Sequence, residues 1–264
     1  MTALAVPDRQ YKRISLTPTS GALGMEVTGV DLSEPLDDGL FAEIEQAFHD
    51  NLVLVFRDQK IEPKHQLTFT HRFGPSEEHP LGSRRGLDDY PDVMVLENRP
   101  GKLGPRNDFW HSDISFGEVP PALSMLHAIE VSPGVADTMF CNMYKAYEGL
   151  SDTLRNFLDG LDAEHNAETL VTEVPSRVRV SEVPPGVVHP VVRTHPKTGR
   201  KALYVNPYYT SHFIGMTKAE SAPILEYLYA KSPEPYALKQ RSIDFGALPV
   251  AQLSSTNLHL KHNP

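Results

Sequence analysis

The chain has 264 residues, of which 40% are hydrophobic and 22% charged, a composition typical of a globular protein with a sizeable core. Its 34 acidic and 25 basic side chains give a net charge of −9, which argues against a general nucleic-acid binder. The single cysteine, Cys141, excludes an internal disulfide and a cysteine-rich zinc site. No apolar run approaches the ~18 residues of a membrane span. The first residues lack the pattern of a secretory signal, so we expect a cytoplasmic protein.

The first half of the chain predicts short strands and helices. Two small strands are expected within residues 12–30, and apolar residues at helical spacing follow a helix entry at 33–38. Asn51–Asp58 is typical of a buried strand, and Pro63–Gly74 has the opening proline and closing glycine of a short helix. The polar stretch 75–109, interrupted by an expected strand at Asp92–Glu97, has the length and composition of a loop that covers a site.

The second half predicts a β-rich region followed by helices. Strands are expected in FWHSDISF (109–116), ALSMLHAIEV (122–131) and ADTMFCN (136–142), and Met143–Leu161 carries a helical pattern. Val187–Val205 predicts two strands joined by a Lys-Thr-Gly turn, and Ala219–Lys231 predicts an amphipathic helix. Because no repeat or linker interrupts the chain, we expect a single α+β domain over residues 1–264.

One short pattern, Trp110-His111-Ser112-Asp113, contains residue types that bind metal ions. On a strand, His111 and Asp113 would point to the same side, because side chains alternate between the two faces. An imidazole and a carboxylate held together are two of the three ligands of a 2-His-1-carboxylate iron site, which leaves positions open for a co-substrate and dioxygen. The pair is also typical of a half-buried histidine hydrogen-bonded to a carboxylate, and the triplet alone does not separate the two.

Longer segments on both sides of this pattern resemble a known family. They are Gly24–Val27, Leu54–Arg57, Asn107–Asp113, Ala136–Thr138, His189–Pro196 and Gly199–Asn206. In this order the chain resembles the Fe(II)- and 2-oxoglutarate-dependent dioxygenases of the taurine dioxygenase family, up to about residue 235. The resemblance implies a double-stranded β-helix (jelly-roll) core with flanking helices and with the metal inside the barrel mouth.

The resemblance also implies roles for individual residues. His111 and Asp113 match the first two ligands of Fe(II). Thr138 matches the threonine that contacts a carboxylate of 2-oxoglutarate, while His79 and Asn107 match residues that line the substrate pocket.

The C-terminal segment departs from the family pattern. The second histidine ligand of the family lies in a Trp-Asp-Asn-Arg-x-x-x-His pattern, whose place is taken here by AQLSSTNLH (251–259). His259 is therefore the candidate third ligand, with His262 as a nearby alternative. The family also has an arginine beyond that histidine, which pairs with the far carboxylate of 2-oxoglutarate, and this sequence does not reach its position. We expect a jelly roll that is incomplete at its C-terminal strand.

The expected activity is hydroxylation of a small organic acid, with decarboxylation of 2-oxoglutarate to succinate. A sulfonate, an alkyl sulfate or an aryloxyalkanoate is the class that the resemblance implies. Gly82 and Val171 stand where taurine-type members have aromatic residues, which argues against taurine itself. The expected partners are this acid and dioxygen, with no nucleic acid and no membrane.

Two other readings remain open at this point. The first is a catalytically impaired homologue that binds ligands without turnover, favoured by the altered C-terminal motif. The second, a zinc hydrolase, is less favoured because the sequence has no His-Glu-x-x-His cluster. The sequence leaves the oligomeric state open, a homo-oligomer included.

Overall fold

The largest sheet is formed by segments from both ends of the chain. A computed structural model describes residues 11–19, 23–76, 86–96, 109–130, 138–173, 183–231, 237–240, 250–255 and 258–262, with the backbone alone for 171–173 and for those after 230. The five strands follow the order β1-β2-β3-β12-β4, in which only β2 and β3 run parallel. Their bounds are β1 Ser15–Pro18, β2 Met25–Thr28, β3 Val53–Phe56, β4 Leu123–Ala128 and β12 Val250–Ser255.

Smaller sheets make up the rest of the β structure in the described residues. Strand β5 (Thr138–Asn142) lies between β11 (Ala237–Gln240) and β13 (Leu258–His262), antiparallel to both. Another sheet has the order β10-β6-β7, and a two-stranded hairpin pairs β8 with β9. The bounds of these strands are β6 Asp162–His165, β7 Val187–Pro190, β8 Val192–Thr194, β9 Lys201–Leu203 and β10 Thr210–Phe213.

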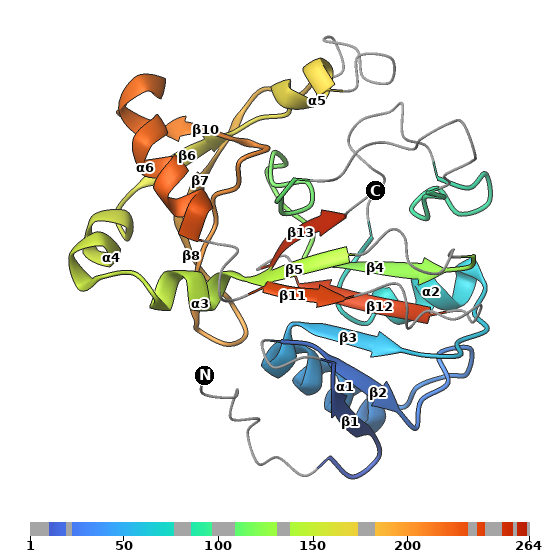
Figure 1. The fold of residues 1–264 in the computed structure, drawn as a ribbon. Helices are drawn as coiled ribbons and strands as arrows, with labels where there is room; N and C mark the ends of the chain where they lie inside the picture. Colours follow the sequence, from blue (N-terminus) through green and yellow to red (C-terminus); the bar gives the residue numbers. More distant parts are fainter. Residues whose placement is uncertain are drawn as a thin grey trace.

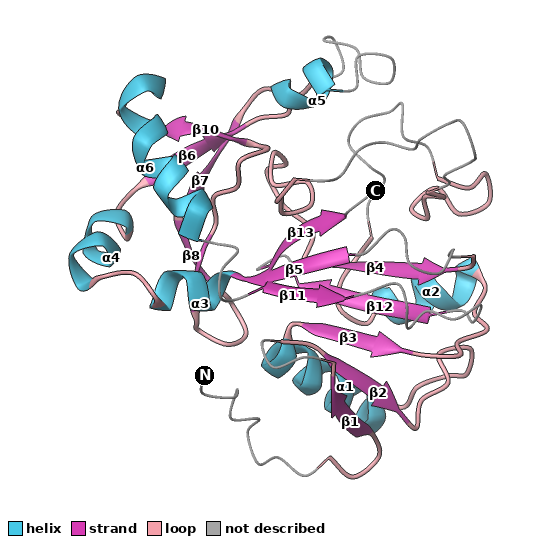
Figure 2. Ribbon diagram, viewed as in Figure 1, coloured by secondary structure: helices cyan, strands magenta, loops and turns pink. Residues whose placement is uncertain are grey.

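Helices flank the sheets on their outer sides. Figure 1 shows α1 against the sheet that contains β1, β2 and β3, and α6 beside the β10-β6-β7 sheet, with the same elements coloured by type in Figure 2. The helices are α1 Asp38–Asn51, α2 Pro63–Thr70, α3 Met143–Glu148, α4 Asp152–Leu158, α5 Glu168–Glu173 and α6 Lys218–Lys231. None of the helices in the described part of the chain has both the length and the apolar character that a membrane crossing requires.

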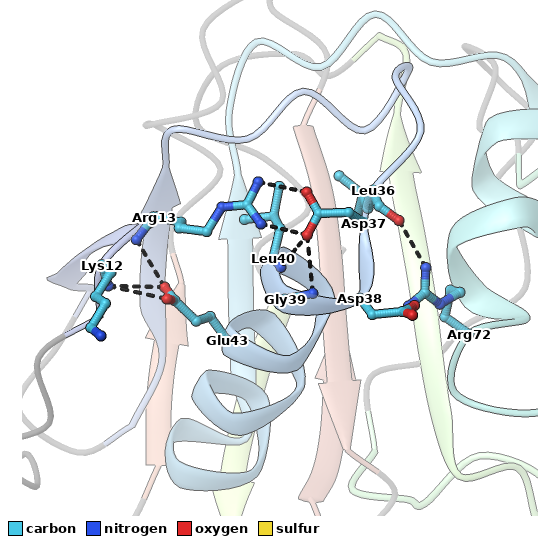
Figure 3. Close-up of polar contacts among 9 residues, drawn as sticks. All are labelled: Lys12, Arg13, Leu36, Asp37, Asp38, Gly39, Leu40, Glu43 and Arg72. Atoms are coloured by element: carbon cyan, nitrogen blue, oxygen red, sulfur yellow. Dashed lines mark hydrogen bonds and ion pairs between the residues drawn. The ribbon is translucent and has the colours of Figure 1, made fainter.

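Helix α1 is held at its N-terminus by a network of charged groups (Figure 3). The carboxylate of Asp37 accepts hydrogen bonds from the amides of Gly39 and Leu40, both at 3.0 Å, as an N-cap does. It also pairs with both arms of the Arg13 guanidinium, which holds the pKa of the Asp37 carboxyl well below its usual range. Arg72, which follows α2, donates to the carboxylate of Asp38 at 2.7 Å. The network ties the N-terminal segment and both helices together.

Two apolar clusters fill the space between these layers. One joins α1, α2, β2 and β3, and the fully buried Ile44, Ala47, Leu54 and Phe56 are among its members. The other joins β5, α3, the β8–β9 hairpin and α6, and includes Phe140, Tyr144 and Leu228. The β3 run Val-Leu-Val-Phe is fully buried, as its continuous apolar character predicts.

The structure corrects three expectations about local structure. Residues 92–96 form no strand, and Glu97 lies outside the described residues. The predicted helix Met143–Leu161 is two helices, because the hydroxyl of Ser151 accepts the amide of Leu154 at 3.3 Å and caps a new helix there. The segment FWHSDISF forms no strand either, which bears directly on the site.

Candidate active site

A turn, and not the predicted strand, carries His111 and Asp113. After Asp113 the chain passes through a left-handed residue, Ile114, with φ of +49°, and the amide of Gly117 then bonds the carbonyl of Ile114 at 3.0 Å. A positive φ at a β-branched residue ends any regular strand, and such conformations are often found at functional sites. The two side chains still come together, although the alternation of a strand is not the reason.

Hydrogen bonds orient both side chains of this pair. Nδ1 of the buried His111 lies 3.0 Å from the carbonyl oxygen of Phe109, which can only accept, so Nδ1 carries a proton and Nε2 is the nitrogen that can bind a metal when the ring is neutral. Nε2 lies 3.3 Å from Oδ1 of Asp113. The hydroxyl of Ser124, on β4, donates to the other oxygen, Oδ2, at 2.5 Å. Nε2 of His111 and Oδ1 of Asp113 are therefore the two atoms of this pair that face each other.

The separation of these atoms fits two ligands of one metal ion. Ligands about 2.1 Å from a metal and at a right angle to each other lie about 3 Å apart. The 3.3 Å between His111 Nε2 and Asp113 Oδ1 is close to that value. Within the part of the chain that the structure describes, no group of three or more His, Cys, Asp or Glu residues could hold a metal ion. The described residues thus include the candidate ligands His111 and Asp113, without a third candidate beside them.

The two candidates for the third ligand lie on β13. The backbone of β13 pairs with β5, with His259 opposite Cys141 and His262 opposite Thr138. Their side chains lie outside the described part of the chain. The register therefore brings both histidines beside β5 without choosing between them.

The remaining predicted site residues fall in different parts of the chain. Thr138 is the first residue of β5 and is half-buried. His79 and Asn107 lie outside the described residues, so the structure does not test their place at the site.

Buried polar residues that the sequence did not single out hold the turn in place. Nδ1 of His165 lies 3.1 Å from the hydroxyl of Ser115, which also accepts a hydrogen bond from the side-chain amide of Asn206 at 3.0 Å. Nε2 of His189 donates to the carbonyl of Gly117 at 2.9 Å. Burial lowers the pKa of His189, so this imidazole stays neutral. We refer to His165, His189 and Asn206 as the turn clamp, and it contacts the chain two to four residues after Asp113.

Aromatic rings form one side of the site. Phe109 stacks on Tyr208 with ring centroids 3.6 Å apart, and Tyr209 lies edge-on to His111 at 6.4 Å. The ring centroids of Phe116 and Tyr209 lie 5.0 Å apart. The only feature of the sequence that points to this aromatic side of the site is the pair Tyr208-Tyr209. It follows Asn206 closely, in a segment where no helix or strand was predicted.

Comparison with known proteins identifies the family. The model of the "Taurine catabolism dioxygenase TauD, TfdA family" matches residues 14–238. The chain belongs to this family. This TauD/TfdA protein is 34% identical over 219 residues to an α-ketoglutarate-dependent 2,4-dichlorophenoxyacetate dioxygenase of Cupriavidus pinatubonensis, covering 76% of each chain. It is also 28% identical over 236 residues to an alkylsulfatase of Acinetobacter baylyi, covering 85% of this chain and 72% of the relative.

A solved structure confirms the fold. The crystal structure of a taurine dioxygenase from Burkholderia xenovorans matches with a TM-score of 0.79 and 29% identity, over 96% of this chain and 84% of that one. The α+β class and the jelly-roll core with flanking helices are therefore confirmed. So is the enzyme class: a TauD/TfdA protein is a 2-oxoglutarate-dependent dioxygenase, and the family implies Fe(II) and 2-oxoglutarate. The expectation that the jelly roll is incomplete at its C-terminal strand stays a prediction. The described residues after 236 form β11, β12 and β13.

Proposed function

We propose that this TauD/TfdA dioxygenase hydroxylates a small organic acid at a metal held by His111 and Asp113. The observation that carries the proposal is the 3.3 Å approach of His111 Nε2 to Asp113 Oδ1, with each side chain oriented by a second hydrogen bond. Such outer hydrogen bonds are typical of metal ligands, since they set the tautomer and the direction of the donor atom. Bound iron and 2-oxoglutarate supply the oxidising chemistry, and the chain supplies placement.

The other residues of the site take the roles that the family pattern assigns. One histidine of β13 completes the ligand set, His259 being the first candidate and His262 the alternative. Thr138 binds a carboxylate of 2-oxoglutarate, and His79 and Asn107 contact the substrate.

We also propose how the chain is organised around this site. Residues 1–264 form one domain, in which the stretch 75–109 covers the site and limits the access of water. The turn clamp keeps His111 and Asp113 at their separation when substrate enters.

An acid that carries an aromatic or other apolar group is the substrate that the site favours. Phe109, Tyr208 and Tyr209 place ring faces and edges next to His111, and such surfaces stack on planar apolar groups. One relative acts on 2,4-dichlorophenoxyacetate, which combines an aromatic ring with a carboxylate. An aryloxyalkanoate is accordingly the first class to assay, followed by alkyl sulfates and sulfonates.

An anaerobic titration with Fe(II) and 2-oxoglutarate tests this function. Chelation of iron by the 2-oxo acid gives a weak visible charge-transfer band, and we expect the band in the wild-type protein but not in His111→Ala. His259→Ala and His262→Ala are titrated in parallel, and the one that loses the band identifies the third ligand. A wild-type protein that gives no band and binds Fe(II) weakly would instead support the impaired homologue.

A further inference from the structure

Two arginines of the β8–β9 hairpin stack on tyrosines but differ in their charge partners. The guanidinium of Arg200 lies 4.1 Å from the ring centroid of Tyr144 and pairs with the carboxylate of Glu148 at 2.8 Å. The guanidinium of Arg193 lies 5.0 Å from the ring centroid of Tyr204. None of the ion pairs among the described residues includes Arg193, which is half-buried. The hairpin therefore holds one neutralised cation and one cation with no described carboxylate.

The hydroxyl of Tyr204 also lacks a partner in the described part of the chain. Tyr204 is 2% exposed, and its hydroxyl is buried without a hydrogen-bond partner there. Burial raises the pKa of this phenol to about 12, so it stays a hydrogen-bond donor at neutral pH. The side chain of Arg193 acts on this hydroxyl and lowers its pKa, against the larger effect of burial. The Tyr204 ring stacks on His165 at 5.5 Å, and His165 contacts the hydroxyl of Ser115, two residues after Asp113. Tyr204 therefore lies next to the turn that carries the proposed metal ligands. A buried donor without a partner is costly unless a ligand satisfies it.

We propose that Arg193 and Tyr204 bind a carboxylate beside the metal site. A guanidinium donates two parallel hydrogen bonds to a carboxylate, and a phenol can donate one more to the same group. Binding would neutralise Arg193 and satisfy the Tyr204 hydroxyl in a single step. The inference rests on the proposed function, in which two acids enter the site. The carboxylate belongs either to 2-oxoglutarate or to the acid substrate, since both present the same chemistry.

Binding titrations of the full-length protein test the proposal without turnover. The probes are N-oxalylglycine, a 2-oxoglutarate analogue, and 4-chlorophenoxyacetate, added with and without saturating Mn(II). Calorimetry reports binding, as does the fluorescence of Trp110, the only tryptophan and the neighbour of His111. Arg193→Met should lower the affinity for one of the two probes by about 10- to 100-fold, the range expected for the loss of charge-assisted hydrogen bonds. Arg193→Lys should recover part of that loss, because it keeps the charge without the fork.

Matched variants separate binding from folding. Tyr204→Phe removes only the hydroxyl. It should lower the affinity for the same probe by about 3- to 10-fold, while Tm stays unchanged or rises. Arg200→Met removes the other arginine–tyrosine stack and should leave both affinities unchanged. A drop in Tm with unchanged probe affinity in the Arg193 variants would show a purely structural role and overturn the proposal.

The two probes distinguish the source of the carboxylate. Weakened N-oxalylglycine binding assigns the site to 2-oxoglutarate, and weakened 4-chlorophenoxyacetate binding alone assigns it to the substrate. Equal affinity of wild type and Arg193→Met for both probes overturns the inference, as does a wild-type protein that binds neither probe with or without Mn(II). If wild type forms succinate from 2-oxoglutarate while Arg193→Met binds both probes normally, this inference alone fails and the proposed function stands.

Discussion

Ser124 donates a hydrogen bond to Oδ2 of Asp113, and this contact joins β4, the last strand in the order of the five-stranded sheet, to the turn that carries the candidate metal ligands. It leaves the other carboxylate oxygen facing His111 at 3.3 Å. A freely rotating aspartate would present either oxygen at varying distance, so the serine selects one geometry before any metal binds. The sheet thus acts as a rigid support for one ligand of the site.

Replacing Ser124 should weaken metal binding more than it weakens the fold. Ser124→Ala removes the anchor of the carboxylate, and losses of outer-shell contacts of this kind lower metal affinity by about 10- to 100-fold. Titration with Fe(II) or Mn(II), followed by Trp110 fluorescence, measures the change. Ser151→Ala is the matched control, because that hydroxyl caps α4 and its loss should cost about 1 kcal/mol of stability without affecting metal affinity. Equal metal affinity of Ser124→Ala and wild type would contradict the role of this contact.

The turn clamp predicts a combined loss of stability and metal affinity. His165→Phe keeps a ring against Tyr204, on which the imidazole stacks at 5.5 Å, but removes the contact with the Ser115 hydroxyl. We expect the free energy of unfolding to fall by about 1–3 kcal/mol, since a buried partner is lost, and metal affinity to fall several-fold. Urea denaturation and metal titration measure the two effects. His212→Phe, on the neighbouring strand and half-exposed, should change neither by much, and a similar effect of both substitutions would argue against the clamp.

His195 makes stability depend on pH in a defined window. Burial is the main reason that its pKa is lowered to about 4, with further lowering from nearby positive groups, namely His49, Arg193, Arg200 and Lys197. Its Nδ1 accepts the amides of Lys197 and Thr198 at 3.1 and 3.2 Å, which a protonated ring could not do. The unfolded chain takes up this proton near pH 6.5 and the folded chain only near pH 4. Acidification through that interval therefore favours unfolding, by about 1–2 kcal/mol after allowance for partial exposure.

A single substitution isolates this titration. Asparagine also accepts backbone amides two and three residues ahead, so His195→Asn keeps the turn and removes the titrating ring. Denaturation curves between pH 4 and 6.5 should show a smaller dependence on pH for this variant than for wild type. Identical slopes would mean that His195 does not set the dependence.

Cys141 reports on the attachment of β13. Its thiol is fully buried, and burial raises its pKa to about 12, so thiol reagents should modify it far more slowly in the native protein than in urea. The strand that carries His259 pairs with it directly. Metal and N-oxalylglycine should slow labelling of Cys141 further if a β13 histidine is a ligand. The ligand is then the histidine whose replacement, at position 259 or 262, removes this additional protection. If metal leaves the labelling rate of Cys141 unchanged in the wild type and in both histidine variants, the third ligand does not lie on β13.

Local pattern was sufficient for much of this protein. The apolar run of β3 and the helical spacing of Phe41, Ile44 and Phe48 in α1 predict buried elements, because burial of one face imposes a period on the sequence. The ordered segments around His111 and Asp113 predicted the family, the jelly-roll core and the cofactors. In each case the information lies in residues that are close together in the chain.

Only the tertiary structure decided how the pair is held and what surrounds it. A turn through Ile114 replaced the expected strand, since its contacts with the rest of the protein outweigh local β propensity. The clamp contacts of Ser115 and Gly117 join residues 50, 72 and 91 positions apart, and no sequence period relates them. The absence of a described carboxylate partner for Arg193 likewise depends on which side chains surround it in space. Separations of this length carry no local signal. The sequence could therefore suggest His111 and Asp113 as a candidate ligand pair, but it could not show the distant residues that hold them in place.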